Sequence, residues 1–193
     1  EINGEFIETT SNSYTVDGTT FTFSAAAEGT EFTNEVKRDY SPAIDAIKSF
    51  VEDYNKLIDD VYGYVDDEPN KDYYFLTEDD KDEMDLSESQ EEKWEKLAKK
   101  GILYRDSTLQ SIMSSLRTAL YSSVDAADGT KVGLYRLGIT TTSNLSDHGK
   151  LQFSPTMTDA EFESTFAQYA DEFAKLFNDS KDGIAYQFDN ILN

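Results

Sequence analysis

An uninterrupted heptad pattern of apolar residues constrains this chain more than any other feature. The pattern begins at Ile44 and ends at Val65, with successive steps of 3, 4, 3, 4, 3 and 4 residues. This spacing predicts a long helix with one apolar stripe along its length. Phe50 and Leu57 widen the stripe, so the helix needs partner helices on two sides, and a bundle is favoured over a two-stranded coil. The stripe consists of Ile44, Ile47, Val51, Tyr54, Ile58, Val61 and Val65.

Start signals predict the other helices of the bundle. Ser41-Pro42 marks the beginning of the long helix, and Thr77 that of a short one. Capping boxes at 87–90, 107–110 and 158–161 each open a further helix. Their apolar faces predict which side of each helix is covered. These faces contain Trp94 and Leu97 in the first helix, Leu109, Ile112, Met113, Leu116 and Leu120 in the second, and Phe162, Phe166, Tyr169, Phe173 and Leu176 in the third.

A last apolar pattern starts after Asp182-Gly183. It contains Ile184, Phe188 and Ile191, and the sequence then stops at residue 193. A helix this short is marginal by itself. We therefore interpret it as a truncated helix whose apolar face stays open, and we expect these three residues to face an assembly partner.

Two regions carry strand patterns. Ser13–Val16 and Thr19–Phe23 flank Asp17-Gly18, a dipeptide typical of a hairpin turn. A second hairpin is predicted near 137–153, whereas 124–133 has the composition of a loop. The sequence thus predicts an α+β fold, with a strand-rich segment over 1–39 and a mainly helical domain over 40–193.

The charge of the chain excludes several classes of partner. Seventeen Lys and Arg stand against 39 Asp and Glu, which gives a formal net charge of −22. Nucleic acids and anionic membranes need clustered cations, so neither is expected to bind. No apolar run approaches the 18 or more residues of a membrane-spanning helix, so no membrane insertion is expected.

Residues that could carry catalysis are scarce. There is no Cys, which excludes thiol catalysis and Cys-based metal sites. The single His, His148, falls in a predicted turn, where we interpret it as an exposed turn residue. A pair of carboxylates could in principle serve a glycoside hydrolase, but the acidic residues lie in solvated runs. We therefore expect no enzyme activity, no cofactor and no metal.

A resemblance to a known family rests on a motif around Trp94. The motif runs through Lys93-Trp94-Glu95 and Ala98-Lys99-Lys100-Gly101-Ile102-Leu103. Further stretches agree in the family's order, and they cover residues 50–58, 116–117, 137–141, 149–153, 176–177 and 182–185. With them, nearly the whole chain resembles the bacterial flagellar filament cap proteins, also called hook-associated protein 2. The chain departs from the family pattern at Phe75, where proline is usual, and at Tyr104.

The resemblance implies a structural role. Cap proteins form a homo-oligomeric plate with legs at the growing filament tip, where they direct the folding and insertion of flagellin. It implies that 1–39 ends the head domain, that 40–193 is a leg truncated before the C-terminal coiled coil, and that the protein is exported through the flagellar secretion system to the outside of the cell.

Two other functions remain open at this stage. Some family members contact host mucus, so an adhesin that binds mucin or glycan is the main alternative, and a carboxylate-pair hydrolase is the third. For the leg, we expect the core and motif anchors to be Phe50, Tyr54, Trp94, Leu97, Leu109 and Leu116.

Overall fold

The computed structural model describes residues 6–8, 10–16, 18–22 and 38–193. The chain divides into two compact units, Glu1–Arg38 and Asp39–Asn193. The α+β class is confirmed, because the larger unit is mostly helical and carries two short antiparallel strand pairs.

In the smaller unit, β1 (Ser13–Val16) pairs with β2 (Thr19–Thr22) in an antiparallel hairpin. Gly18 between them has a φ of +78°, a conformation that favours glycine. Phe21 of β2 is half-buried. Phe23, which we expected on the same face, lies outside the described residues.

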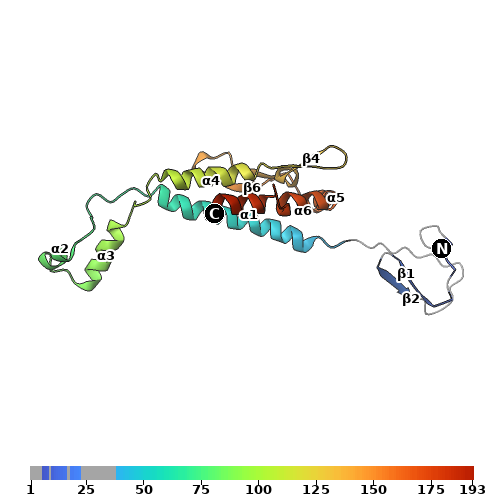
Figure 1. Cartoon of the computed structure of the whole chain (residues 1–193), viewed down its shortest axis with the longest axis horizontal. Helices are drawn as coiled ribbons and strands as arrows, with labels where there is room; N and C mark the ends of the chain where they lie inside the picture. The colour runs from blue at the N-terminus through green and yellow to red at the C-terminus, as the bar shows by residue number, and fades with distance from the viewer. Residues whose placement is uncertain (1–5, 9, 17, 23–37) are drawn as a thin grey trace. The chain divides into compact units, whose positions relative to one another are not determined.

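The larger unit is organised around α1 (Ser41–Val65), the helix predicted from the heptad pattern. Its core is completed by α4 and the three C-terminal helices, and Figure 1 shows these running alongside α1. Gly63 does not end the helix, which continues to Val65. The helices of this unit are α2 (Glu78–Glu83), α3 (Glu88–Ala98), α4 (Ser107–Ala119), α5 (Asp159–Gln168), α6 (Ala170–Asn178) and α7 (Ile184–Leu192).

Short strands and 3-10 turns pack against the helices of the bundle. The predicted hairpin near 137–153 is present as β5 (Ile139–Thr141) and β6 (Leu151–Phe153), in register from Ile139–Phe153 to Thr141–Leu151. A 3-10 helix, η1 (Leu134–Leu137), precedes it, and another, η2 (Leu145–Asp147), lies in its connection. These elements bury Leu134, Leu137, Ile139 and Leu151 in the bundle core.

Two predicted helix starts are displaced by one residue. Asp39 accepts a hydrogen bond from the Ser41 backbone N–H at 2.9 Å, and Tyr40 rather than Ser41 occupies the N-cap. Asp106 caps α4 by accepting from Leu109 N–H at 2.8 Å, so the expected capping box at 107–110 is absent. In both places a carboxylate upstream of the hydroxyl takes the contact, and carboxylates are strong acceptors at a helix N-terminus.

Two further segments differ from the sequence prediction. The expected loop at 124–133 contains a small hairpin, β3 (Val124–Asp125) and β4 (Lys131–Val132), closed by Asp128-Gly129. The single helix expected from 158 onward is broken at Tyr169, which separates α5 from α6. The break leaves Phe162, Phe166, Phe173 and Leu176 all buried in the core. Phe166 and Phe173 stack with their ring centroids 5.4 Å apart.

Candidate functional site

No metal-binding cluster is found in the part of the chain that the structure describes. Within those residues, no group of three or more His, Asp or Glu side chains is placed to hold a metal ion. A cavity of about 90 Å³ lies between Leu120, Leu134 and Leu151. This volume is well below the roughly 300–1,000 Å³ of typical ligand pockets. The described helices also include none long and apolar enough to cross a membrane.

His148 is not the exposed turn residue that we expected. Its ring stacks on that of Tyr62 with centroids 3.8 Å apart, and its Nε2 lies 2.9 Å from an oxygen of Asp66. The His148 backbone has a φ of +52°, which turns the chain back toward α1. The imidazole therefore ties the β5–β6 connection to the C-terminal end of α1, and sequence reasoning missed it because Tyr62 and Asp66 are more than 80 residues away.

The same face of α1 holds β6 and the residue before it by two hydrogen bonds and an ion pair. The Asn55 side chain accepts from Leu151 N–H at 2.7 Å and donates to its carbonyl at 2.9 Å. Lys150 forms an ion pair with Asp59 at 2.6 Å. Residues 55, 59, 62 and 66 follow one another in steps of 4, 3 and 4, so these contacts make a polar row beside the apolar stripe. The row fixes the position of the hairpin along α1.

Most of the predicted anchors on α1 and α4 lie in the core or at its edge. Tyr54 and Leu116 are buried, Phe50 packs against the core, and Leu109 is half-buried. Burial raises the pKa of Tyr54 to about 12. Its hydroxyl has no hydrogen-bond partner among the described residues. Tyr54 therefore contributes to packing and not to polar chemistry.

Trp94 and Leu97 do not pack into the bundle core. Both lie on α3, which has no buried residue, and both are half-buried. The Trp94 ring packs against the edges of Tyr73 and Tyr74 at centroid distances of 4.7 and 5.9 Å, and its Nε1 donates to the Tyr74 carbonyl at 2.8 Å. Trp94 thus holds α3 to the preceding loop. We call residues 66–105, which stand apart from the bundle helices in Figure 1, the tip segment.

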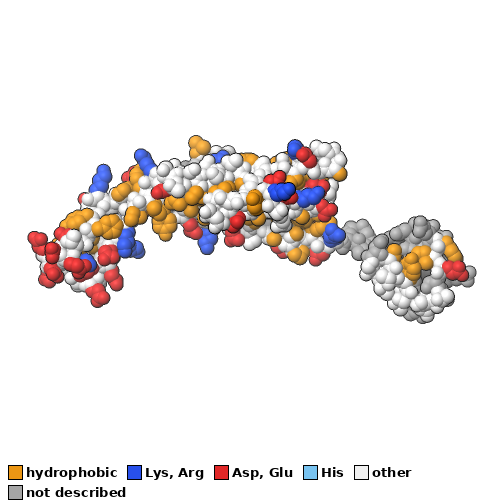
Figure 2. Space-filling model, viewed as in Figure 1, with side chains coloured by type: hydrophobic (Ala, Val, Ile, Leu, Met, Phe, Trp, Pro, Cys, Tyr) orange, Lys and Arg blue, Asp and Glu red, His pale blue; other side chains and the backbone are white. Residues whose placement is uncertain are grey.

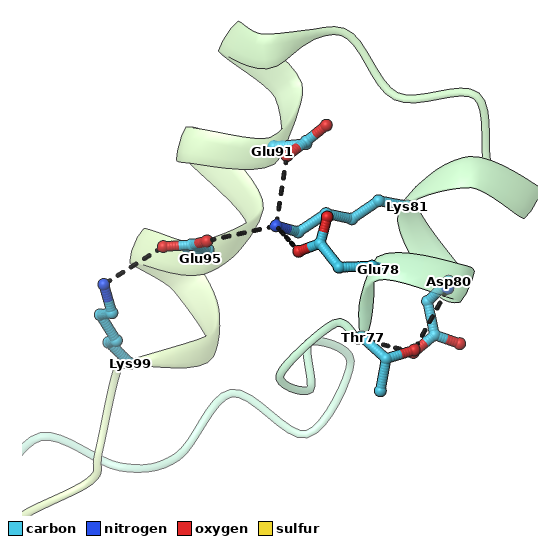
Figure 3. A network of polar contacts seen from close by, with 7 residues as sticks. All are labelled: Thr77, Glu78, Asp80, Lys81, Glu91, Glu95 and Lys99. Atoms are coloured by element: carbon cyan, nitrogen blue, oxygen red, sulfur yellow. Dashed lines mark hydrogen bonds and ion pairs between the residues drawn. The ribbon is translucent and has the colours of Figure 1, made fainter.

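A polar network joins the two helices of the tip segment (Figure 3). Lys81 on α2 contacts Glu78 at 2.9 Å, Glu91 of α3 at 3.5 Å and Glu95 of α3 at 4.0 Å. The hydrogen bond to Glu78 is the main cause that raises the pKa of Lys81. The Lys81 ammonium therefore links one helix to the other, while its side chain is only 18% exposed.

The tip segment joins the bundle through two chain stretches that lie side by side. The Arg105 N–H donates to the Val65 carbonyl at 2.8 Å. Lys100 pairs with Asp67 at 3.1 Å, and the Tyr104 hydroxyl donates to Glu68 at 3.1 Å. Gly101 has a φ of +76°, and a Cβ on it would lie 2.2 Å from the backbone of Pro69. The close approach and the positive φ together require glycine in the Trp-centred motif.

The predicted assembly-facing stripe is largely covered within the chain. Ile184 is buried in the core, and α7 packs against α4 and α6. Phe188 lies 6.0 Å from Phe50 and 6.5 Å from Tyr54 between ring centroids, and Ile191 packs at the edge of the core. The expectation that this stripe stays open was wrong for Ile184, because α7 packs against α4 and α6 of the same chain.

Comparison of the sequence with known proteins identifies the family of this chain. The model of the C-terminal region of flagellar hook-associated protein 2 matches residues 1–193. The chain belongs to this family. The predicted resemblance is thereby confirmed, and no solved structure matches the chain.

A curated relative supports the same assignment. The flagellar hook-associated protein 2 of Halalkalibacterium halodurans is 34% identical over 141 residues, which cover 73% of this chain and 26% of the relative. The chain therefore spans about a quarter of the length of this hook-associated protein 2, and it corresponds to the C-terminal region of the family.

Proposed function

We propose that this chain is the leg region of a flagellar filament cap that directs flagellin folding and insertion. The observation that carries the proposal is the match of the hook-associated protein 2 family model to all 193 residues. A mainly helical unit with a single hydrophobic core suits a structural role, because packed helices transmit force without a ligand.

The partners and place of action follow from the same proposal. The protein would work as a homo-oligomer at the filament tip, outside the cell, with flagellin as its partner, and would be exported by the flagellar secretion system. Such export requires an unfolded chain, and the lack of Cys is compatible with that because no disulfide can block unfolding. We propose no enzymatic step. Neither the described structure nor the comparisons support a mucin-binding adhesin or a hydrolase.

Deletion of the gene in its own bacterium tests the proposal. Without a cap, exported flagellin diffuses away, so the culture medium should contain flagellin monomers and the cells should lack filaments. Immunoblots of cell-free medium and of sheared filaments measure the secreted and the assembled flagellin. The wild-type gene on a plasmid should restore filaments. Normal filaments in the deletion strain would exclude a cap function.

A further inference from the structure

The tip segment exposes large apolar side chains close to where it joins the bundle. Ile102 is 68% exposed, Tyr64 is 63% exposed, Phe75 57% and Tyr74 56%. The Arg105 N–H donates to the Val65 carbonyl, the backbone of Gly101 lies close to that of Pro69, and the Trp94 side chain donates to the Tyr74 carbonyl, so these stretches run beside one another. We call Tyr64, Tyr74, Phe75 and Ile102 the tip patch. Figure 2 shows apolar side chains along this part of the surface.

Strong negative charge lies beyond the tip patch. Residues 72–92 contain ten Asp and Glu and one Lys, which is Lys81, so this stretch has a net charge of −9. Lys81 is already occupied by Glu78, Glu91 and Glu95. Four Lys follow at 93, 96, 99 and 100, of which Lys99 pairs with Glu95 and Lys100 with Asp67. Figure 2 shows the acidic side chains gathered at the far end of the segment.

The combination points to one kind of partner. A few large side chains, aromatic ones prominent among them, supply much of the affinity at protein interfaces once they are buried by the partner, while charged rims set orientation and association rate. We infer that the tip patch docks onto a filament-subunit surface that carries Lys and Arg around an apolar recess. This inference rests on the proposed cap function and assigns its contact with the filament to the tip segment.

A second copy of this chain fits the tip patch poorly. Each copy carries a net charge of −22, so two acidic tips repel each other over about 10 Å at 0.1 M salt. A basic partner surface would attract the acidic tip and not repel it. The acidic rim therefore selects against self-association and in favour of a basic partner.

The construction of the tip segment suits a docking element. Neither α2 nor α3 contains a buried residue, so the outward side chains of the segment are not needed for the bundle core. Phe75 and Ile102 are absent from the hydrophobic core and from its partly buried shell. Substitutions there should leave the bundle folded, which makes the inference testable.

Photo-crosslinking in living cells identifies what covers the patch. A benzoyl-phenylalanine at Phe75, in the protein as encoded in its bacterium, should crosslink to a filament subunit at a peptide rich in Lys or Arg. The same probe at Leu145, which is 93% exposed on the bundle, is the matched control and should give little product. The inference would be overturned if the Phe75 probe crosslinked to a second copy of the protein or to an acidic peptide. It would also be overturned if the yield at Phe75 were no higher than at Leu145.

Substitutions test the two parts of the surface separately. Phe75→Ser should lower the crosslinking yield from a neighbouring Tyr74 probe by roughly tenfold, the size expected for a central interface side chain. The triple variant Asp82→Asn, Glu83→Gln and Glu92→Gln should also lower the crosslinking yield. This loss should be larger at low salt than at high salt. The controls are Leu145→Ser and the combination Asp45→Asn, Glu52→Gln and Glu163→Gln, which are exposed positions on the bundle.

Filament growth separates failure of this inference from failure of the cap function. If wild-type protein restores filaments to the deletion strain and the tip variants restore them equally well, with undiminished crosslinking, the inference fails and the cap function stands. If wild-type protein restores nothing, the cap function itself fails. Circular dichroism of each purified variant confirms that the bundle is folded.

Discussion

At the scale of single residues, the structure separates packing from chemistry. Tyr54 shows this most clearly, because its ring fills the core while its hydroxyl is buried without a partner among the described residues. A buried polar group that makes no hydrogen bond destabilises the folded state. The Tyr54 hydroxyl is therefore a defect in the core of the bundle.

Removing that hydroxyl should not harm the protein. We expect Tyr54→Phe to leave the free energy of unfolding unchanged or to raise it by about 1 kcal/mol, since the ring is kept and an unpaired group is lost. Urea denaturation measures the change. A loss above about 1 kcal/mol would show that the hydroxyl has a partner in solution, for which ordered water is the candidate.

The pH dependence of the same variant gives an independent test. The folded pKa of Tyr54 is raised to about 12 from an ordinary value of 10, so the folded state holds the proton more tightly than the unfolded state. This contribution is fully present below pH 10 and is lost as pH rises toward 12. The wild type should therefore lose more stability than Tyr54→Phe between pH 10 and 12.

At the scale of elements, the tip segment behaves differently from the bundle. The bundle helices share a core, whereas α2 and α3 are held by aromatic contacts around Trp94 and by the carboxylates around Lys81 (Figure 3). Segments with few buried apolar contacts open at lower free energy than the rest of a protein. We expect the tip segment to exchange its amide hydrogens before α1 does.

Substitution of Trp94 should act locally. Removing a fully buried Trp costs about 3–5 kcal/mol, but the half-buried Trp94 lies outside the core. Trp94→Ala should therefore raise hydrogen exchange over 73–98 and lower the global unfolding free energy by less than about 1 kcal/mol. Leu116→Ala, in the core of α4, is the control and should cost about 2–5 kcal/mol. Equal global losses would place Trp94 in the same cooperative unit as the core.

The Lys81 network predicts a second local effect. Lys81→Gln leaves Glu78, Glu91 and Glu95 close together without a cation, so like charges should push α2 away from α3. Exchange over 78–86 should rise, most clearly at low salt. Lys99→Gln removes a single exposed pair with Glu95 and serves as the matched control. Protection in α2 that is the same in both variants would mean that the network does not hold the helices together.

At the scale of the whole molecule, the coverage of the core and the net charge both favour a monomer. The larger unit buries Ile184 and covers most of α7 within the chain. The apolar side chains that stay exposed on the described bundle, such as Tyr121, Leu145 and Leu192, come from different elements, and the charge of −22 opposes association.

The isolated chain should therefore be monomeric. Sedimentation at micromolar concentration and moderate salt should give one species near 21.8 kDa. Raising the salt to 1 M screens the repulsion between copies and serves as the control condition. An oligomer that survives dilution would locate a cap assembly interface within these 193 residues.

Local sequence signals determined much of the secondary structure. The heptad register from Ile44 to Val65 specified α1, and Thr158 with Glu161 specified the start of α5, because both depend on residues a few positions apart. The β3–β4 hairpin also had a local signal, Asp128-Gly129 between Val124 and Val132, which the loop interpretation overlooked. The Trp-centred motif is local in the same sense, and its residues were sufficient to indicate the family.

Only the tertiary structure decided which of these faces are covered. Ile184 lies buried because α7 packs against α4 and α6, and His148 is stacked because Tyr62 lies opposite it in space. Trp94 has the same helical spacing as a core residue, yet it packs against Tyr73 and Tyr74 in the tip segment. Periodicity shows that a face is apolar, but the neighbour that covers it comes from residues distant in the chain.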